Sequence, residues 1–205
     1  LAKEAPNLTA PRVQRTKDDQ LIATIDAPDG KRLVWLLNYI PSKLYAETKP
    51  HTRELLGSFG KALAGFDKAL LNFDHSAAKR TLKWDLSKAE WIGEHVKDIA
   101  DEQQRNIVQR IFEAYVGTVQ PALVEVRHSV IHNDANDYNV LVHEGRVSSL
   151  IDFGDMLYAP TICELAIAAA YAMMGHDDPL AALVNMVRGY HSVLPLAEKE
   201  LELLF

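Results

Sequence analysis

The feature that most constrains the fold is a pair of short apolar runs separated by a tight-turn sequence. Residues 140–142 and 147–151 are rich in Val, Leu and Ile, and they flank a Glu-Gly dipeptide within residues 143–146. This arrangement is typical of a β-hairpin. Because a hairpin folds the chain back on itself, Asn139 just before it and Asp152 just after it are expected at the same edge.

Polar side chains crowd around this hairpin. Four aspartates and three asparagines lie within residues 131–155, among apolar neighbours that a packed core would normally separate from them. The oxygens of Asn139 and Asp152 suit a hard cation such as Mg²⁺, which completes its coordination with water and phosphate oxygens. Asp134, five residues before Asn139, is placed to accept a proton from a hydroxyl that attacks that phosphate. The segment therefore predicts a magnesium-dependent site for phosphoryl transfer.

The same segment resembles the catalytic loop and the metal-binding triplet of protein-kinase-like phosphotransferases. The two motifs occur in the expected order, His132-Asn133-Asp134 with Asn139 and then Asp152-Phe153-Gly154. A long activation segment has no room here, because an apolar helical pattern begins by Thr161. A small-molecule kinase is therefore favoured over a protein kinase.

Longer strings narrow this resemblance. HNDANDYNVLV, IDFGDM and ICELAIAAAYAMM are similar to the aminoglycoside phosphotransferase and choline kinase superfamily, and look closest to hydroxylysine kinase-type phosphotransferase domains. The resemblance implies that Asp134 is the catalytic base and that Asn139 and Asp152 are the Mg²⁺ ligands. It also implies that His132 buttresses the loop, that Glu164 braces it, and that the cofactors are Mg²⁺ and ATP or GTP.

The fold implied by the resemblance is α+β, protein-kinase-like and two-lobed. Residues 1–40 would be a partial N-terminal lobe, reduced to a few antiparallel strands up to the hinge. Residues 41–205 would be a mostly helical C-terminal lobe that carries the catalytic hairpin. The glycine-rich phosphate loop, strand lysine and helix glutamate of the kinase template are not found in the sequence. We therefore expect the chain to be part of a longer polypeptide and to be inactive alone.

Local patterns predict the other elements. A hairpin is expected around the Pro28-Asp29-Gly30 turn, with residues 33–37 as a buried strand. Helical spacing of apolar residues predicts helices at about 52–72 and 101–119, and Pro121 is expected to follow the end of the second. A buried helix is predicted from Thr161 to Met174, and another after Asp178-Pro179. Trp84 and Trp91 are expected to anchor the irregular stretch between helices to the core.

Several polar residues near the motifs admit two interpretations. Asp155 could be a second residue near the metal, a recognition group for a cationic substrate, or an exposed turn residue. Asp137 could contact substrate or merely shape the loop. Glu164 also fits a capping box with Thr161. Tyr39 and Ile40, at the expected hinge, could present backbone groups to a purine, or could simply end a strand.

Composition limits the partners. The chain has 22 Lys and Arg against 28 Asp and Glu, without a basic tract, so nucleic acid is not expected as a partner. No apolar stretch reaches about 18 residues, so a membrane is not expected either. The single cysteine, Cys163, lies in an apolar run and fits a reducing cytoplasm, which is the predicted location.

The functional hypothesis is transfer of a nucleotide γ-phosphoryl group to the hydroxyl of a small molecule. The acidic residues around the site suit a substrate that carries an ammonium group, such as hydroxylysine, an aminoglycoside or choline. Two alternatives remain open from the sequence. One is a non-catalytic nucleotide-binding pseudokinase domain of a larger protein, and the other is a metal-dependent phosphohydrolase that activates water.

Overall fold

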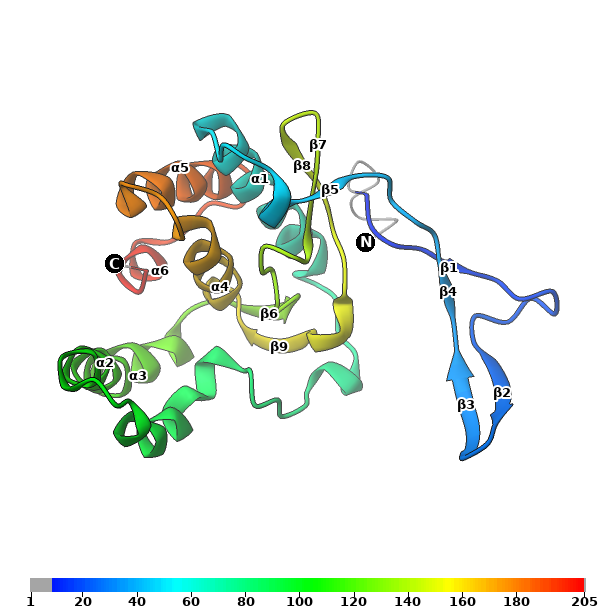
Figure 1. Cartoon of the computed structure of the whole chain (residues 1–205), viewed down its shortest axis with the longest axis horizontal. Helices are drawn as coiled ribbons and strands as arrows, with labels where there is room; N and C mark the ends of the chain where they lie inside the picture. The colour runs from blue at the N-terminus through cyan, green and yellow to red at the C-terminus, as the bar shows by residue number, and fades with distance from the viewer. Residues whose placement is uncertain (1–8, 205) are drawn as a thin grey trace.

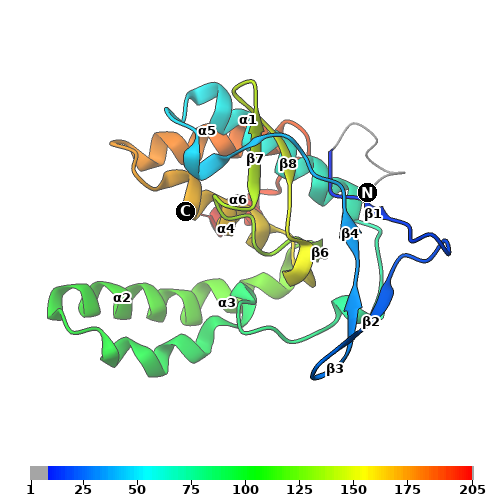
Figure 2. The ribbon, with the colours of Figure 1, turned by 45° about the vertical axis from the view of Figure 1, so that its right-hand side comes forward.

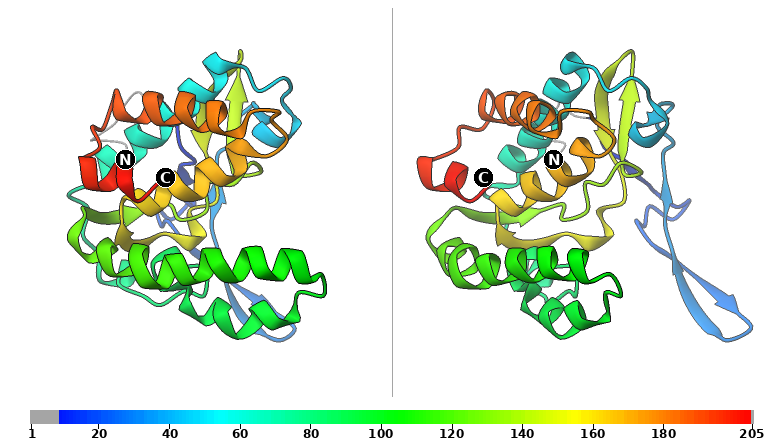
Figure 3. Two further views of the ribbon diagram at one scale, coloured as in Figure 1. Left: turned by 90° about the vertical axis from the view of Figure 1, so that its left-hand side faces the viewer. Right: turned by 60° about the vertical axis from the view of Figure 1, so that its left-hand side comes forward.

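The protein has a projecting N-terminal arm of strands and a larger helical lobe. The structure is a computed structural model and describes residues 9–204. Figure 1 shows the arm extending from one side of the molecule, and Figure 2 and the right view of Figure 3 show the same separation from other directions. Within the described residues, no helix is both long and apolar enough to cross a membrane.

The arm consists of two pairs of antiparallel strands. Its elements are β1 (Val13–Gln14), β2 (Ala23–Ala27), β3 (Gly30–Val34) and β4 (Leu36–Leu37). β2 pairs with β3 and β1 pairs with β4. The predicted hairpin is confirmed: Ala27 is opposite Gly30, whose φ of 125° is one that glycine adopts without strain.

The predicted burial of residues 33–37 is wrong. Leu33 is 65% exposed and Leu36 is 68% exposed, and all five residues of β3 are exposed. The apolar run does form strands, but each strand has one partner and the described residues provide no layer that covers the arm. An apolar run is buried only when another element packs on it.

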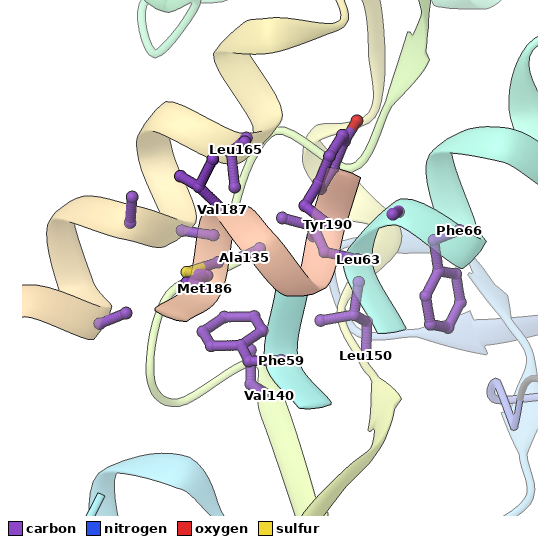
Figure 4. Packing of buried hydrophobic residues seen from close by; sticks show 14 of the residues in the cluster. Phe59, Leu63, Phe66, Ala135, Val140, Leu150, Leu165, Met186, Val187 and Tyr190 are labelled. Carbon is purple, nitrogen blue, oxygen red and sulfur yellow. The ribbon is translucent and has the colours of Figure 1, made fainter. Parts of the chain in front are cut away.

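The core of the lobe lies between two helices that are far apart in the sequence, α1 (Arg53–Leu70) and α5 (Pro179–His191). Figure 4 shows Phe59 and Leu63 of α1 packed with Met186 and Tyr190 of α5. The helices approach closely at two glycines. A Cβ on Gly60 would lie 2.0 Å from the Met186 carbonyl oxygen, and one on Gly189 would lie 2.1 Å from the Gly57 oxygen.

The helix α4 (Ile162–Met173) packs beside this pair and buries seven of its twelve residues. The predicted burial on all sides is wrong, because Ala170 is exposed and Ile167 and Tyr171 are half-buried. The predicted cap of α5 is confirmed, because the Asp178 side chain accepts a hydrogen bond from the Ala181 N–H and Pro179 is the first helical residue. The predicted helix at 52–72 is confirmed as α1. A short helix, α6 (Glu198–Glu202), ends the described part of the lobe.

The region between α1 and the catalytic loop departs from two predictions. The helix predicted at 101–119 is α2 (Glu102–Ala114), and it continues through a π-helix (Tyr115–Val119) into α3 (Gln120–Ala122), so Pro121 lies inside the helical run. None of the residues of α2 is buried. Trp84 is 63% exposed and does not anchor its segment in the core. The remaining short helices are Tyr45–Glu47, Ser76–Ala78, Leu86–Asp98, Leu123–Glu125 and Phe153–Asp155.

Two small sheets position the predicted catalytic loop, residues 132–139. The first is β5 (Lys43–Leu44), β7 (Val140–His143) and β8 (Arg146–Leu150), and the second is β6 (His128–Ile131) with β9 (Leu157–Pro160). The predicted β7–β8 hairpin is confirmed, with positive φ at Glu144 and Gly145 in its turn. Because β6 leads into residues 132–139 and β9 follows residues 151–156, the two loops run side by side (Figure 1).

Candidate active site

His132 joins the two loops. It is buried directly after β6, and its Nε2 lies 2.9 Å from the Ile151 carbonyl oxygen. Its ring packs edge-on against Phe153, with 4.8 Å between the ring centroids. A side chain fixed by both a hydrogen bond and an aromatic contact holds the start of the catalytic loop beside the Asp-Phe-Gly triplet.

The carboxylate of Asp134 is held in place by two amide side chains. Asn136 Nδ2 donates to Oδ1 at 2.8 Å, and Asn139 Nδ2 donates to Oδ2 at 2.7 Å and to the Asp134 carbonyl oxygen at 2.9 Å. Asp134 itself is half-buried. A carboxylate held in one orientation while still in contact with solvent can meet an incoming hydroxyl, which is the first geometric requirement of a general base.

Glu164 lies beneath this loop. It is fully buried in α4, and its Oε2 accepts a hydrogen bond of 2.8 Å from the backbone N–H of Asn133. Asn133 has a φ of 68°, which Asn tolerates better than most residues. Burial raises the pKa of Glu164, and the nearby His132 opposes that shift. The carboxylate therefore sets the path of the backbone immediately before Asp134.

The capping box predicted between Thr161 and Glu164 is not formed. The Thr161 side chain makes no cap hydrogen bond, and its Oγ1 lies 2.8 Å from Ser129 Oγ. The Thr161 N–H donates instead to the Arg127 carbonyl oxygen at 2.8 Å. Glu164 and Thr161 both have buried partners on the β6 side, and these replace the local interaction that the sequence suggested.

Asn139 and Asp152 lie at the open end of the β7–β8 hairpin. Val140 is opposite Leu150, and the Ile151 N–H donates to the Asn139 carbonyl oxygen at 2.9 Å. Asp152 follows with a φ of 60°, and its Oδ1 accepts from the Gly154 N–H at 3.3 Å. The chain therefore turns sharply at the residue that the sequence assigns to the metal.

The donor atoms at this end suit a hard cation. The Asn139 amide nitrogen is used by Asp134, which leaves Oδ1 as its free ligand atom, and the Asp152 side chain is exposed. One amide oxygen and one carboxylate match the one or two protein ligands that Mg²⁺ uses when phosphate oxygens complete its shell. Between residues 9 and 204 no group of three His, Cys, Asp or Glu side chains could hold a metal, so a metal cage of protein ligands alone is not found there.

Two cavities are lined by residues of these two loops. One, of about 510 Å³, is lined by Asp134, Asn133 and Asp155, together with Asp85 and Trp84. The other, of about 610 Å³, is lined by Asp152, Phe153 and Gly154 and by apolar residues of the arm. The predicted base and the predicted metal ligand therefore line different cavities, whereas the sequence led us to expect them at one shared site.

The remaining predicted residues lie elsewhere. Asp137 does not line the cavity beside Asp134, and its carbonyl oxygen accepts from the Ala46 N–H at 2.9 Å. Tyr39 is 84% exposed and lines a third hollow beside the β7–β8 turn, whereas Ile40 is buried. The structure does not bring these hinge residues together with Asp152, so their contact with a purine stays a prediction.

The match to a protein-family sequence model shows which family the chain belongs to. The model described as "Phosphotransferase enzyme family" matches residues 2–201, nearly the whole chain. The chain belongs to this phosphotransferase family. Curated relatives include the hydroxylysine kinases of Mus musculus, 30% identical over 210 residues, and Xenopus laevis, 32% identical over 209 residues. The alignments cover 94% and 93% of this chain and 56% of each relative, so the chain spans about half the length of these relatives.

Solved structures confirm the predicted kinase-like fold. An amicoumacin kinase in complex with AMP-PNP, Ca²⁺ and Ami superposes with a TM-score of 0.66 at 15% identity, covering 94% of this chain and 59% of the other. A microcompartment-associated aminopropanol kinase superposes with a TM-score of 0.61 at 19% identity, covering 97% and 63%. At these identities the likeness shows the fold alone.

Two further residues beside the candidate site, Arg80 and Asp85, carry no signal in the sequence. Arg80 donates from Nη2 to the Gly154 carbonyl oxygen at 2.5 Å and from Nε to the Met156 oxygen at 3.0 Å, and so holds the turn after Asp152. Asp85 lines the cavity beside Asp134. Both come from an irregular segment about 50 to 75 residues before the loops that they meet, and no local pattern marks such a contact.

Proposed function

We propose that the protein is a small-molecule kinase that transfers the γ-phosphoryl group of Mg-ATP or Mg-GTP to a hydroxyl. The observation that carries the proposal is the position of Asp134, which two amides orient at the wall of one cavity while Asp152 lines another. The names of the relatives, all of which are kinases or phosphotransferases, support the same reaction.

In this proposal each side chain has a defined task. Asp134 accepts the proton of the attacking hydroxyl, and Asn136 and Asn139 keep its carboxylate aimed at that oxygen. Asn139 and Asp152 would hold Mg²⁺, which supplies neutralisation of phosphate charge when bound. His132, Glu164 and Arg80 fix the loops, because phosphoryl transfer depends mainly on positioning and electrostatic stabilisation.

The acceptor that we propose carries an ammonium group beside its hydroxyl. The cavity next to Asp134 also has the carboxylate of Asp155 in its wall, and the chain has a net charge of −6. Negative walls attract a cationic substrate and repel an anionic one. Hydroxylysine is the first candidate, because four hydroxylysine kinases are among the curated relatives. Aminoglycosides and choline are the other candidates.

The test is a transfer assay on the intact protein with Mg-ATP or Mg-GTP, with and without hydroxylysine. We expect a phosphate ester on the hydroxyl, detected by phosphorus NMR, and nucleotide loss that depends on the acceptor. Nucleotide loss at the same rate without an acceptor would indicate a phosphohydrolase. Nucleotide binding without turnover on any amino alcohol would indicate a pseudokinase. Either result would overturn the proposal.

A further inference from the structure

The cavity beside Asp134 contains a buried carboxylate that the proposed chemistry does not use, that of Asp85. Asp85 is only 2% exposed and is the N-cap of the 3-10 helix Leu86–Asp98. Its Oδ1 accepts hydrogen bonds from the Ser87 N–H at 3.0 Å and from Ser87 Oγ at 2.6 Å. The capping role therefore occupies one oxygen of the carboxylate.

The other oxygen, Oδ2, has no hydrogen-bond partner among the described residues. The charge nearest to it is the ammonium group of Lys88, 3.1 Å away, on a side chain that is 54% exposed. A buried carboxylate requires a counter-charge. Here that charge is on a long and mostly exposed lysine, which can move into water without disturbing the core.

Asn133 is a second, independent observation that points to a hydrogen-bond donor on a ligand in this cavity. It is 4% exposed and lines the same cavity, and its Oδ1 is buried without a hydrogen-bond partner in the part of the chain that the structure describes. Its φ of 68° is one at which glycine would fit with less strain. A polar side chain at such a position, with an unpaired acceptor, is explained if a ligand provides the missing N–H.

The aromatic part of the wall also suits a cation. Trp84 and Trp91 line the cavity, and the Lys83 ammonium lies 4.3 Å from the centre of the Trp91 ring. Positive groups are attracted to the faces of indole rings. Carboxylate, amide and indole groups therefore line this cavity, together with Lys83, whose ammonium group already contacts the Trp91 ring.

We propose that Asp85 binds the ammonium group of the acceptor, with Asn133 as a second hydrogen-bond acceptor, and that Lys88 occupies this position when no acceptor is bound. The inference deepens the proposed function and rests on it. Replacing one ammonium group by another leaves the charge of the buried site unchanged, so acceptor binding buries no uncompensated charge. An alcohol without an amine cannot make this exchange.

Asp85→Asn tests the carboxylate, because Asn keeps the N-cap acceptor and replaces Oδ2 by an uncharged NH2 group that cannot accept from an ammonium. In the intact protein we expect KM for hydroxylysine to rise about ten- to a hundredfold, the range of a charge-assisted hydrogen bond. We expect kcat to change less and KM for the nucleotide to stay the same. Two matched probes each lack one amine, 2-amino-5-hydroxyhexanoic acid and 6-amino-5-hydroxyhexanoic acid. With the probe that lacks the amine bound by Asp85, the Asp85→Asn substitution should leave KM unchanged.

Lys88→Met tests the exchange, because it removes the competing ammonium and keeps the length of the side chain. We expect KM for hydroxylysine to fall in this variant and to show no such fall when Asp85→Asn is also present. The inference is contradicted if Asp85→Asn weakens all three acceptors equally, or if Lys88→Met raises KM. Calorimetric titration with hydroxylysine separates the two proposals. Binding that depends on Asp85, without any phosphoryl transfer, would overturn the proposed function and leave the ammonium site standing.

Discussion

Similar apolar side chains are exposed in the N-terminal arm and buried in the helical lobe. Leu33 and Trp35 of the arm are 65% and 58% exposed, whereas Leu63 and Phe59 of the lobe are fully buried between α1 and α5. Both regions formed the secondary structure that their patterns predict. The difference shows that a pattern specifies an element, and that burial depends on a second element that packs against it.

The arm and the lobe also contribute differently to the candidate site. The residues proposed for catalysis are held by contacts within the lobe, since His132, Glu164 and Arg80 all bind the two loops there. The arm contributes Trp35 and Leu37 to the cavity beside Asp152 through exposed side chains. The stability of the protein and the geometry of the catalytic loop should therefore depend on the lobe far more than on the arm.

The largest effect is expected where α1 and α5 touch. Gly60→Ala would place a Cβ 2.0 Å from a backbone oxygen of α5, and no rotamer change can relieve that contact. We expect a loss of about 3 kcal/mol or more in the free energy of unfolding. Gly57→Ala, one turn away in α1, is the matched control. Its Cβ would meet an ordinary contact at 3.8 Å, and better helix propensity should make it neutral or slightly stabilising. Equal stability of the two variants would show that the helices do not pack as described.

A smaller effect is expected from a buried carboxyl in the same interface. Asp67 of α1 accepts a hydrogen bond of 2.5 Å from the Tyr190 hydroxyl of α5. Burial raises the pKa of Asp67 well above its usual range, the charge of Glu164 adds to the rise, and the Tyr190 hydrogen bond opposes it. The folded protein therefore keeps a proton that the unfolded chain releases, and this contribution to stability is lost as the pH rises from the unfolded pKa through the folded one.

Asp67→Asn should remove that dependence, because Asn is neutral and can still accept from Tyr190. The difference in unfolding free energy between variant and parent should rise with pH from about pH 4 upward, by at most about 1.4 kcal/mol per pH unit. Denaturant titrations across this range measure it, with exposed Asp177→Asn as the control. Parallel curves for variant and parent would contradict the burial of an acidic group here.

The smallest effect is expected in the arm. Leu33→Ala in β3 removes a side chain that is 65% exposed, and we expect it to change the unfolding free energy by less than about 0.5 kcal/mol. The same substitution at fully buried Leu63 should cost about 2–5 kcal/mol. Comparable losses at the two positions would mean that the arm is covered in solution and that the contrast between the two regions is wrong.

The sequence predicted what is encoded locally. The β7–β8 hairpin follows from two short apolar runs and a Glu-Gly turn, and α1 follows from one apolar stripe. The sequence did not predict contacts between segments that are far apart along the chain. The capping box predicted for Thr161 and Glu164 does not form, because both side chains bind residues in or directly after β6. Arg80 and Asp85 reach the site from an irregular segment, which no periodicity could reveal.

The central claim is that the lobe holds Asp134 ready to accept a hydroxyl proton. Asp134→Asn preserves the shape of the side chain and removes its basicity, so the most direct measurement is kcat for phosphoryl transfer in the intact protein beside the dissociation constant for Mg-nucleotide. We predict a fall in kcat of about a hundredfold or more with nucleotide binding nearly unchanged, and no change for exposed Asp98→Asn. Full turnover by the Asp134 variant would contradict the account.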